Sequence, residues 1–204
     1  MSSVLNRKKK KSENRFFSDS ETVSLLEHDS NVILVRRTYH TIEKIGYYIL
    51  RWKYGFSIKR FQKFQNGIHG CLVAYEEGKE SNKNYMRDFR NLMNKELDLK
   101  IEIEAGKIPF FTKLKLARCK YPTSRSEIET KRGLINGAIE NWYTQATYVL
   151  KYIFNYQPDR VKEFLNYCYE FIEDYAKGGL IDDSDIDSGI SETIYEETKF
   201  RIGA

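Results

Sequence analysis

The feature that most constrains this chain is a set of residues that recurs one hundred positions further on. Residues 48–50 and 148–150 each carry a tyrosine, a β-branched residue and a leucine. The same offset pairs Arg60 with Arg160, Phe64 with Phe164, Tyr75 with Tyr175 and Gly78 with Gly178. Further along, the second copy has one inserted residue, so that residues 93–101 align with residues 194–202. Because the matching positions are mainly large and apolar, the pattern predicts one packing unit that is present twice.

The first unit, residues 39–103, has the periodicity of helices. Apolar residues at helical spacing predict one helix over 39–54, which ends at Gly55, and a second from Ile58 towards Glu77, which Ser57 caps. A third helix is expected over about 82–95. Residues 97–103 then alternate apolar and charged side chains, which is typical of a strand.

The second unit, residues 134–204, repeats this plan. Its first helix begins at about 126 or 134 and ends at 154, and Pro158 occupies the first position of its second helix. We expect Gly178 and Gly179 to end that helix, residues 182–189 to form a solvated acidic loop, and residues 199–202 to be strand-like. The prediction is an all-α fold, an internally duplicated three-helix module (a helix-turn-helix plus a third helix) with short strand-like tails.

The remaining segments are polar. Residues 1–38 begin with a basic run that includes Lys8 to Lys11 and continue rich in serine and acidic residues, so we expect a basic, largely disordered leader. Residues 104–133 hold eight Lys or Arg against three Glu, and they predict a basic linker between the modules.

Composition argues against several classes of protein. The three cysteines (Cys71, Cys119 and Cys168) form no CxxC pair, the three histidines have no ligand spacing, and no nucleophile or phosphate-binding glycine motif is present in the sequence. These patterns favour a non-enzymatic protein with no cofactor and no metal. No apolar run is long enough to predict a membrane span, and we expect a reducing cytoplasm.

The strongest functional signal is a stripe of basic residues interleaved with aromatic ones. Phe110, Phe111 and Tyr121 flank its first part, and its net positive charge suits the phosphates of DNA or RNA. The candidate nucleic-acid-binding residues are Lys113, Lys115, Arg118, Lys120, Arg125, Lys131 and Arg132. The alternative is that these side chains form a solvated face of the linker.

The arginines in the first turn of each second helix, Arg60 and Arg160, are a second candidate site. A helix N-terminus and a guanidinium together can hold a phosphate. The alternative, which we favour, is that each arginine binds carbonyls or a carboxylate inside its own module and joins the second helix of that module to the first.

The second unit is also rich in tyrosine. Seven tyrosines lie between 143 and 175, and they could stack on nucleic-acid bases as a platform. The alternative is that they are core residues with hydroxyls at the surface, some of them in a homo-oligomer interface. The positions are Tyr143, Tyr148, Tyr152, Tyr156, Tyr167, Tyr169 and Tyr175.

The first turn also resembles a known group of proteins. Residues 48–64, with Gly55, Phe56 and Arg60 in the turn, are similar to small helical proteins of Firmicute phages and prophages that carry a Gly-Phe-Gly-x-x-Arg turn; Ser57 replaces the second glycine. The second unit keeps Leu150, Arg160, Phe164 and Glu197 of that pattern. The resemblance implies a phage setting and, in it, the host cytoplasm.

Two functions follow from these observations. The first is a non-enzymatic, phage-type regulatory protein that binds nucleic acid through its basic face. The alternative is a protein-binding inhibitor of a host defence system or host enzyme, acting through the duplicated aromatic helical faces. A net charge of +5 on 204 residues argues against a protein that coats DNA.

Overall fold

The computed structural model describes residues 26–177 and 189–202, and its regular secondary structure there is helical, which confirms the all-α prediction. The described residues from Leu34 onward form one compact unit, and the first turns of α2, before Leu34, are not part of it. The helices are α2 (Leu26–Trp52), α3 (Ile58–Gly78), α4 (Tyr85–Leu97), α5 (Ile101–Lys107), α6 (Phe110–Leu116), α7 (Arg125–Tyr148), the π-helical η1 (Val149–Ile153), α8 (Pro158–Lys177) and α9 (Ser191–Thr198).

The two predicted turns have the same local structure. Gly55 and Asn155 both adopt the left-handed conformation, with φ of 62° and 55°. The next residue donates its backbone N–H to a leucine carbonyl in each turn, from Phe56 to Leu50 at 3.0 Å and from Tyr156 to Leu150 at 2.9 Å. The second helices then begin at positions 58 and 158. The offset of one hundred residues therefore holds for backbone geometry at the turns.

The third helices continue this correspondence. α4 ends at Asp98 with φ of 49°, and α9 ends at Lys199 with φ of 59°, so both have a left-handed C-cap at positions that agree once the inserted residue is counted. Superposition of the two halves over their whole length stays a prediction. The matched stop at Gly178 lies outside the described residues.

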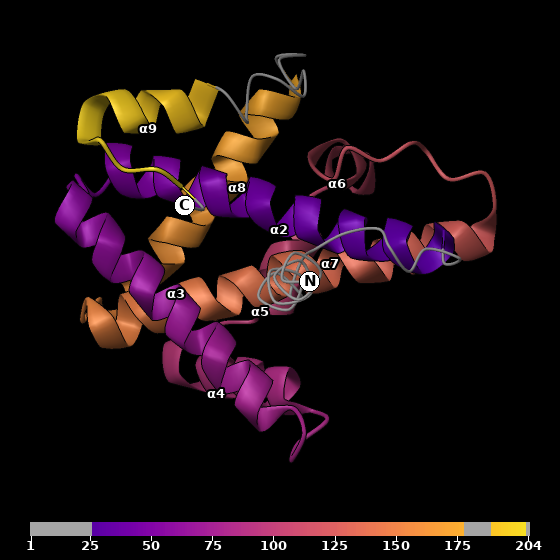
Figure 1. Cartoon of the computed structure of the whole chain (residues 1–204), viewed down its shortest axis with the longest axis horizontal. Helices are drawn as coiled ribbons and strands as arrows, with labels where there is room; N and C mark the ends of the chain where they lie inside the picture. Colours follow the sequence, from indigo (N-terminus) through magenta and orange to yellow (C-terminus); the bar gives the residue numbers. More distant parts are fainter. Residues whose placement is uncertain (1–25, 178–188, 203–204) are drawn as a thin grey trace, which may run out of the picture. The chain divides into compact units, whose positions relative to one another are not determined.

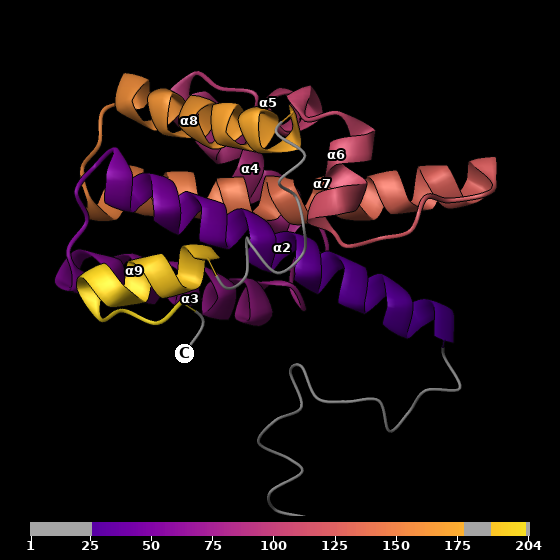
Figure 2. The same ribbon diagram turned by 90° about the horizontal axis from the view of Figure 1, so that it is seen from above.

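α2 and α7 pack closely at a glycine. A Cβ atom added at Gly46 would lie 2.0 Å from a ring carbon of Trp142, so no side chain fits between the two helices at this point. Trp142 is fully buried, as are Ile42 and Ala146 beside the crossing. In the view from above, residues 34–52 of α2 lie between α8 on one side and α9 on the other (Figure 2). The close approach of α2 and α7 therefore forms the centre of the core.

Each third helix ends against the other half of the fold. The Phe200 ring, just after α9, lies 5.4 Å from the Tyr47 ring of α2 and 5.1 Å from the Phe61 ring of α3. In the reverse direction, Asp98 at the end of α4 pairs with Lys162 of α8 at 3.6 Å. Figure 1 shows α9 alongside the C-terminal part of α2. The two halves are thus joined by an exchange of their last elements.

The two predictions of strand-like segments are wrong. Residues 97–103 do not form a strand: the left-handed Asp98 ends α4, and α5 then buries Ile101 and Ala105, which are spaced four residues apart as on one face of a helix. The 199–202 segment is likewise no strand. Among the described residues no strand is present, because the apolar positions find partners at helical spacing.

The basic linker is a folded part of the structure. α6 and the first turns of α7 lie within residues 104–133, and α6 buries Thr112, Leu114 and Leu116. α7 begins at Arg125, one residue before the earlier of the two predicted starts. The leader prediction is wrong for residues 26–38, which are helical in α2. The lysine run at 8–11, Gly178, Gly179 and residues 182–188 lie outside the described residues.

Candidate functional site

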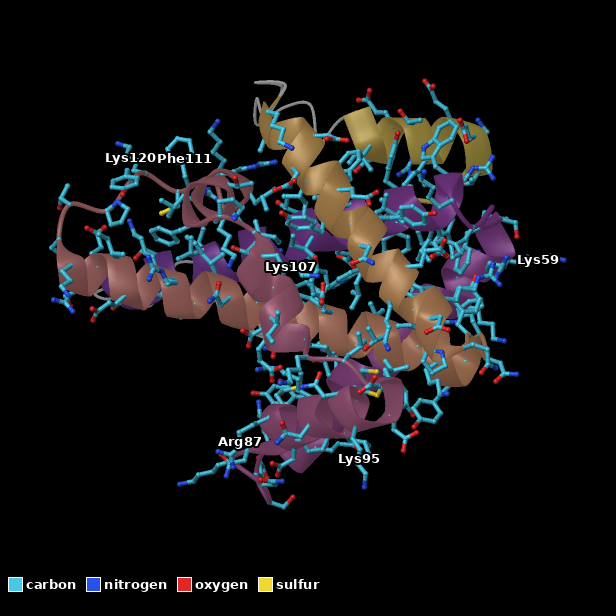
Figure 3. The ribbon with its side chains drawn as sticks, turned by 180° about the vertical axis from the view of Figure 1, so that it is seen from behind. Lys59, Arg87, Lys95, Lys107, Phe111 and Lys120 are labelled. Carbon is cyan, nitrogen blue, oxygen red and sulfur yellow. The ribbon has the colours of Figure 1, made fainter. Side chains whose placement is uncertain are left out.

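Two exposed aromatic rings mark the surface formed by α6 and the loop that follows it. Phe111 is 58% exposed and Tyr121 is 62% exposed, the highest values for aromatic side chains among the described residues. Figure 3 shows Phe111 and Lys120 pointing outward from this region, whereas Lys107 lies on α5. We call the surface made by Phe111, Lys115, Arg118, Lys120, Tyr121 and Arg132 the aromatic–basic face. Four of its cations, Lys115, Arg118, Lys120 and Arg132, are among the candidate residues named from the sequence.

Lys113 does not belong to this face, and its assignment as a phosphate contact is wrong. It is only 4% exposed, because α6 is short and is covered on most of its circumference. Burial lowers the pKa of its ammonium group to about 8; the charge of Arg132 adds to this effect, and the charge of Glu140 opposes it. A lysine buried to this extent cannot reach a nucleic-acid backbone.

The other predicted cations differ in their partners. Arg125 pairs with Glu129 at 3.0 Å, and Lys131 pairs with Glu127 at 2.6 Å, so their charges are partly neutralised. The Lys115 ammonium lies 5.0 Å from the centre of the Phe111 ring. The guanidinium of Arg132 lies 4.9 Å from the centre of the Phe110 ring. Cations beside aromatic rings keep their charge available to an anion.

The loop between α6 and α7 has a defined geometry. Arg118 is left-handed with φ of 50°, and the N–H of Cys119 reaches the carbonyl of Leu114 at 2.9 Å, which closes α6 as a Schellman motif does. At the other end, the Ser124 side chain accepts the N–H of Glu127 and caps α7. Lys131 donates to the Lys120 carbonyl at 3.3 Å. These bonds hold the exposed side chains of the loop in position.

The paired arginines contact aromatic rings of both halves. The Arg60 guanidinium lies 4.1 Å from the centre of the Phe56 ring and 5.4 Å from that of Phe154. Its equivalent, Arg160, lies 4.2 Å from the centre of the Tyr156 ring and 5.2 Å from that of Tyr54. Each arginine therefore stacks on its own turn and on the turn of the other half, an arrangement that fits a structural role in joining the halves.

Arg60 also makes hydrogen bonds both to the other half and within its own turn, so its role is not confined to one module as predicted. It donates to the hydroxyl of Tyr156 at 3.0 Å and to the carbonyl of Tyr54 at 3.4 Å. The aromatic residues of the two turns pack on one another reciprocally, with centroid distances of 4.9 Å for Phe56 with Phe154 and 5.6 Å for Tyr54 with Tyr156. The duplicated aromatic positions of the turns are thus used inside the protein, so a protein partner would need another surface.

The tyrosines of the second half do not form one platform. Tyr143 and Tyr156 are buried, and Tyr148, Tyr167 and Tyr169 are half-buried. Only Tyr152, at 49% exposure, has a largely open ring among those whose side chains are described; the side chain of Tyr175 lies outside the described residues. The alternative in which these tyrosines belong mainly to the core agrees with their burial.

A groove that the sequence prediction missed lies between α3, α4 and the end of α7. Its volume is about 690 Å³, which is within the usual range for small-molecule sites. Its lining includes four small residues on one face of α3, which we call the floor (Gly67, Gly70, Cys71 and Ala74), and the larger residues Tyr85, Phe89, Leu92, Tyr148 and Ile153. Lys63 and Asn66 complete the lining, and the Lys63 ammonium lies 5.3 Å from the centre of the Phe154 ring. The signal in the sequence is the spacing of the four small residues, which places them on one helical face.

No protein-family model matches the chain, and neither the curated proteins nor the solved structures contain a match. The resemblance of the first turn to phage proteins therefore stays a prediction. Within residues 26–177 and 189–202, no three His, Cys, Asp or Glu side chains come together as metal ligands would. Over the same described ranges, none of the helices has the length and apolar character required to span a bilayer.

Proposed function

We propose that the protein binds single-stranded nucleic acid, non-enzymatically, through its aromatic–basic face. The observation that carries the proposal is the pair of largely exposed rings, Phe111 and Tyr121, set among lysine and arginine side chains. Exposing a large ring to water is costly, and a base that stacks on it recovers that cost. Unpaired bases offer their faces to such rings, whereas the bases of a duplex are already stacked.

The cations of the face support a moderate affinity. We expect Lys115, Arg118, Lys120 and Arg132 to contact phosphates. If each makes one contact, affinity for a single strand should fall with a log–log salt slope of about −3. Arg125 and Lys131 add less, because each has a carboxylate partner. The wider role, a regulatory protein of a phage acting in the host cytoplasm, belongs to the same proposal and is supported only by the resemblance of the first turn.

The test is fluorescence anisotropy with labelled single-stranded and duplex oligonucleotides over a range of salt concentrations. Lys120→Gln should lower the salt slope by about 0.7. Tyr121→Ala should weaken binding by about 1–3 kcal/mol and leave the slope unchanged, because stacking releases no counterions. The two classes of variant thus separate phosphate contacts from stacking.

The chain offers matched controls for both kinds of change. Trp52 is another exposed aromatic residue, at 52%, and Lys95 is an exposed lysine on α4 (Figure 3). Trp52→Ala and Lys95→Gln should leave both affinity and slope unchanged. If the wild-type protein binds no oligonucleotide at low salt, or prefers the duplex, the proposal is wrong.

A further inference from the structure

The groove beside α3 has a counterpart in the second half that is filled. The four small residues of its floor correspond, one hundred positions on, to Tyr167, Glu170, Phe171 and Asp174 on α8. There the Phe171 ring packs on Tyr48, with centroids 4.9 Å apart, and the Lys53 ammonium lies 4.6 Å from the centre of the Tyr167 ring. The second half therefore shows which groups occupy this place when it is closed: two aromatic rings, one of them beside a cation.

In the first half, small residues stand in place of Tyr167 and Phe171, but an aromatic residue that corresponds to Tyr48 is still present. Tyr148 corresponds to Tyr48 and lines the groove together with Cys71, which corresponds to Phe171. Tyr148 contacts Phe89 of α4, with centroids 5.3 Å apart, so an aromatic wall already stands where an added ring would pack. Burial of a flat ring against this wall would be favourable because it removes apolar surface from water.

The charge of the groove selects among aromatic ligands. Of the described residues that line it, Lys63 alone is charged. Its counterpart in the filled half is Glu163, which accepts a hydrogen bond from Tyr167 at 3.0 Å. The charge at this position is therefore opposite in the two halves. A cation at the edge of an apolar groove favours a ligand that carries one negative group on an aromatic body.

The backbone is also specialised at this place. η1 is a π-helical turn, in which the N–H of Phe154 bonds the carbonyl of Val149 at 3.1 Å, and its last residue, Ile153, lines the groove. Turns of this kind are rare and are often found at functional sites. Gly67 faces the same turn, because a Cβ atom there would lie 2.6 Å from Ile153 and 2.8 Å from Val149. The floor is therefore closely packed at Gly67 and open at Gly70, where a Cβ atom would have no neighbour within 4 Å.

We infer that this groove is a binding site for a small aromatic anion, a planar ring system with one acidic group. The ring system packs against Tyr148 and Phe89 over the small floor residues, and its acidic group meets the ammonium of Lys63. The inference is independent of nucleic-acid binding, since no residue of the groove belongs to the aromatic–basic face.

The experiment compares two dyes that share one ring system, 8-anilinonaphthalene-1-sulfonate and its uncharged relative N-phenyl-1-naphthylamine, in fluorescence titrations of the full chain. Gly70→Phe fills the groove, whereas Gly70→Ala adds one carbon where nothing lies within 4 Å and should retain binding. Ala74→Phe is a second filling variant one turn further along α3. Lys63→Gln removes the cation, and Lys59→Gln, an exposed lysine of the same helix, is its control.

The wild type should bind the sulfonate saturably, and both filling variants should lose at least about tenfold in affinity while their melting temperatures stay close to that of the wild type. Lys63→Gln should weaken sulfonate binding about tenfold and leave the neutral dye unaffected. Sulfonate binding that survives both filling variants would overturn the inference, and so would the absence of saturable binding. If both filling variants unfold, equal sulfonate affinities of the wild type and Lys63→Gln overturn it instead.

Discussion

Replacing the buried Lys113 by methionine should stabilise the protein at neutral pH. Burial lowers the pKa of its ammonium from 10.5 to about 8, so the charged form is disfavoured in the folded state. Because a tenfold change in a protonation equilibrium corresponds to about 1.4 kcal/mol, the charge costs up to about 3 kcal/mol at pH 7. Methionine has a similar length and carries no charge to desolvate.

The stability difference between Lys113→Met and the wild type should also depend on pH in a defined direction. Below pH 8 the lysine is charged in both the folded and the unfolded protein, and the whole cost is present. Between pH 8 and 10.5 the folded protein releases the proton first, so the cost shrinks as pH rises. The advantage of Lys113→Met over the wild type should therefore fall from about 3 kcal/mol at pH 7 to about 1.5 kcal/mol at pH 9.5.

Urea unfolding followed by far-UV circular dichroism at the two pH values measures this difference. Lys115→Met, two residues away on the same helix and only half-buried, is the matched control and should change the free energy of unfolding little at either pH. The reasoning is refuted if Lys113→Met is no more stable than the wild type at pH 7, or if its advantage is the same at pH 9.5.

Two further predictions concern the contact between the halves. Gly46→Ala should lower the free energy of unfolding by about 3 kcal/mol or more, because its Cβ atom meets the Trp142 ring. Gly70→Ala should be neutral or stabilise by up to about 1 kcal/mol. Equal effects of the two variants in thermal unfolding would contradict the structure. Arg60→Ala should cost about 1–3 kcal/mol, because its side chain donates a hydrogen bond to Tyr156 of the other half. Arg160→Ala should cost less, because Arg160 is more exposed. A melting temperature unchanged in Arg60→Ala would contradict a structural role.

The local signals in the sequence were sufficient for the turns and most helix limits. Gly55 and Pro158 act within a few residues of where they stand, so their positions predicted where α3 and α8 begin. Ser57 occupies the N-cap position of α3 as predicted, but its side chain makes no capping hydrogen bond. Apolar spacing predicted the buried faces of these helices, including Phe61, Phe64 and Phe164. Such signals require no knowledge of distant partners.

The errors arose where distant packing decides the structure. Residues 97–103 alternate like a strand, but Ile101 packs as part of a helix once the left-handed Asp98 has ended α4. The basic residues around Lys113 in the sequence predicted that it is exposed. The apolar residues beside it on α6 are buried, and Lys113 is buried with them. The groove could not be predicted from the small residues of α3 alone, because its other lining residues come from α4, α7 and η1, which meet α3 only in the folded chain.

The exchange of the last elements has a consequence for how the protein is made. Tyr47 and Phe61 leave the ribosome early, yet the ring that packs on both of them, Phe200, is synthesised long afterwards. The first half therefore lacks one of its packing partners while the residues up to Phe200 are made, and its aromatic surface is open to self-association during that time. A chain cut before α9 would leave the Tyr47 and Phe61 rings without this partner.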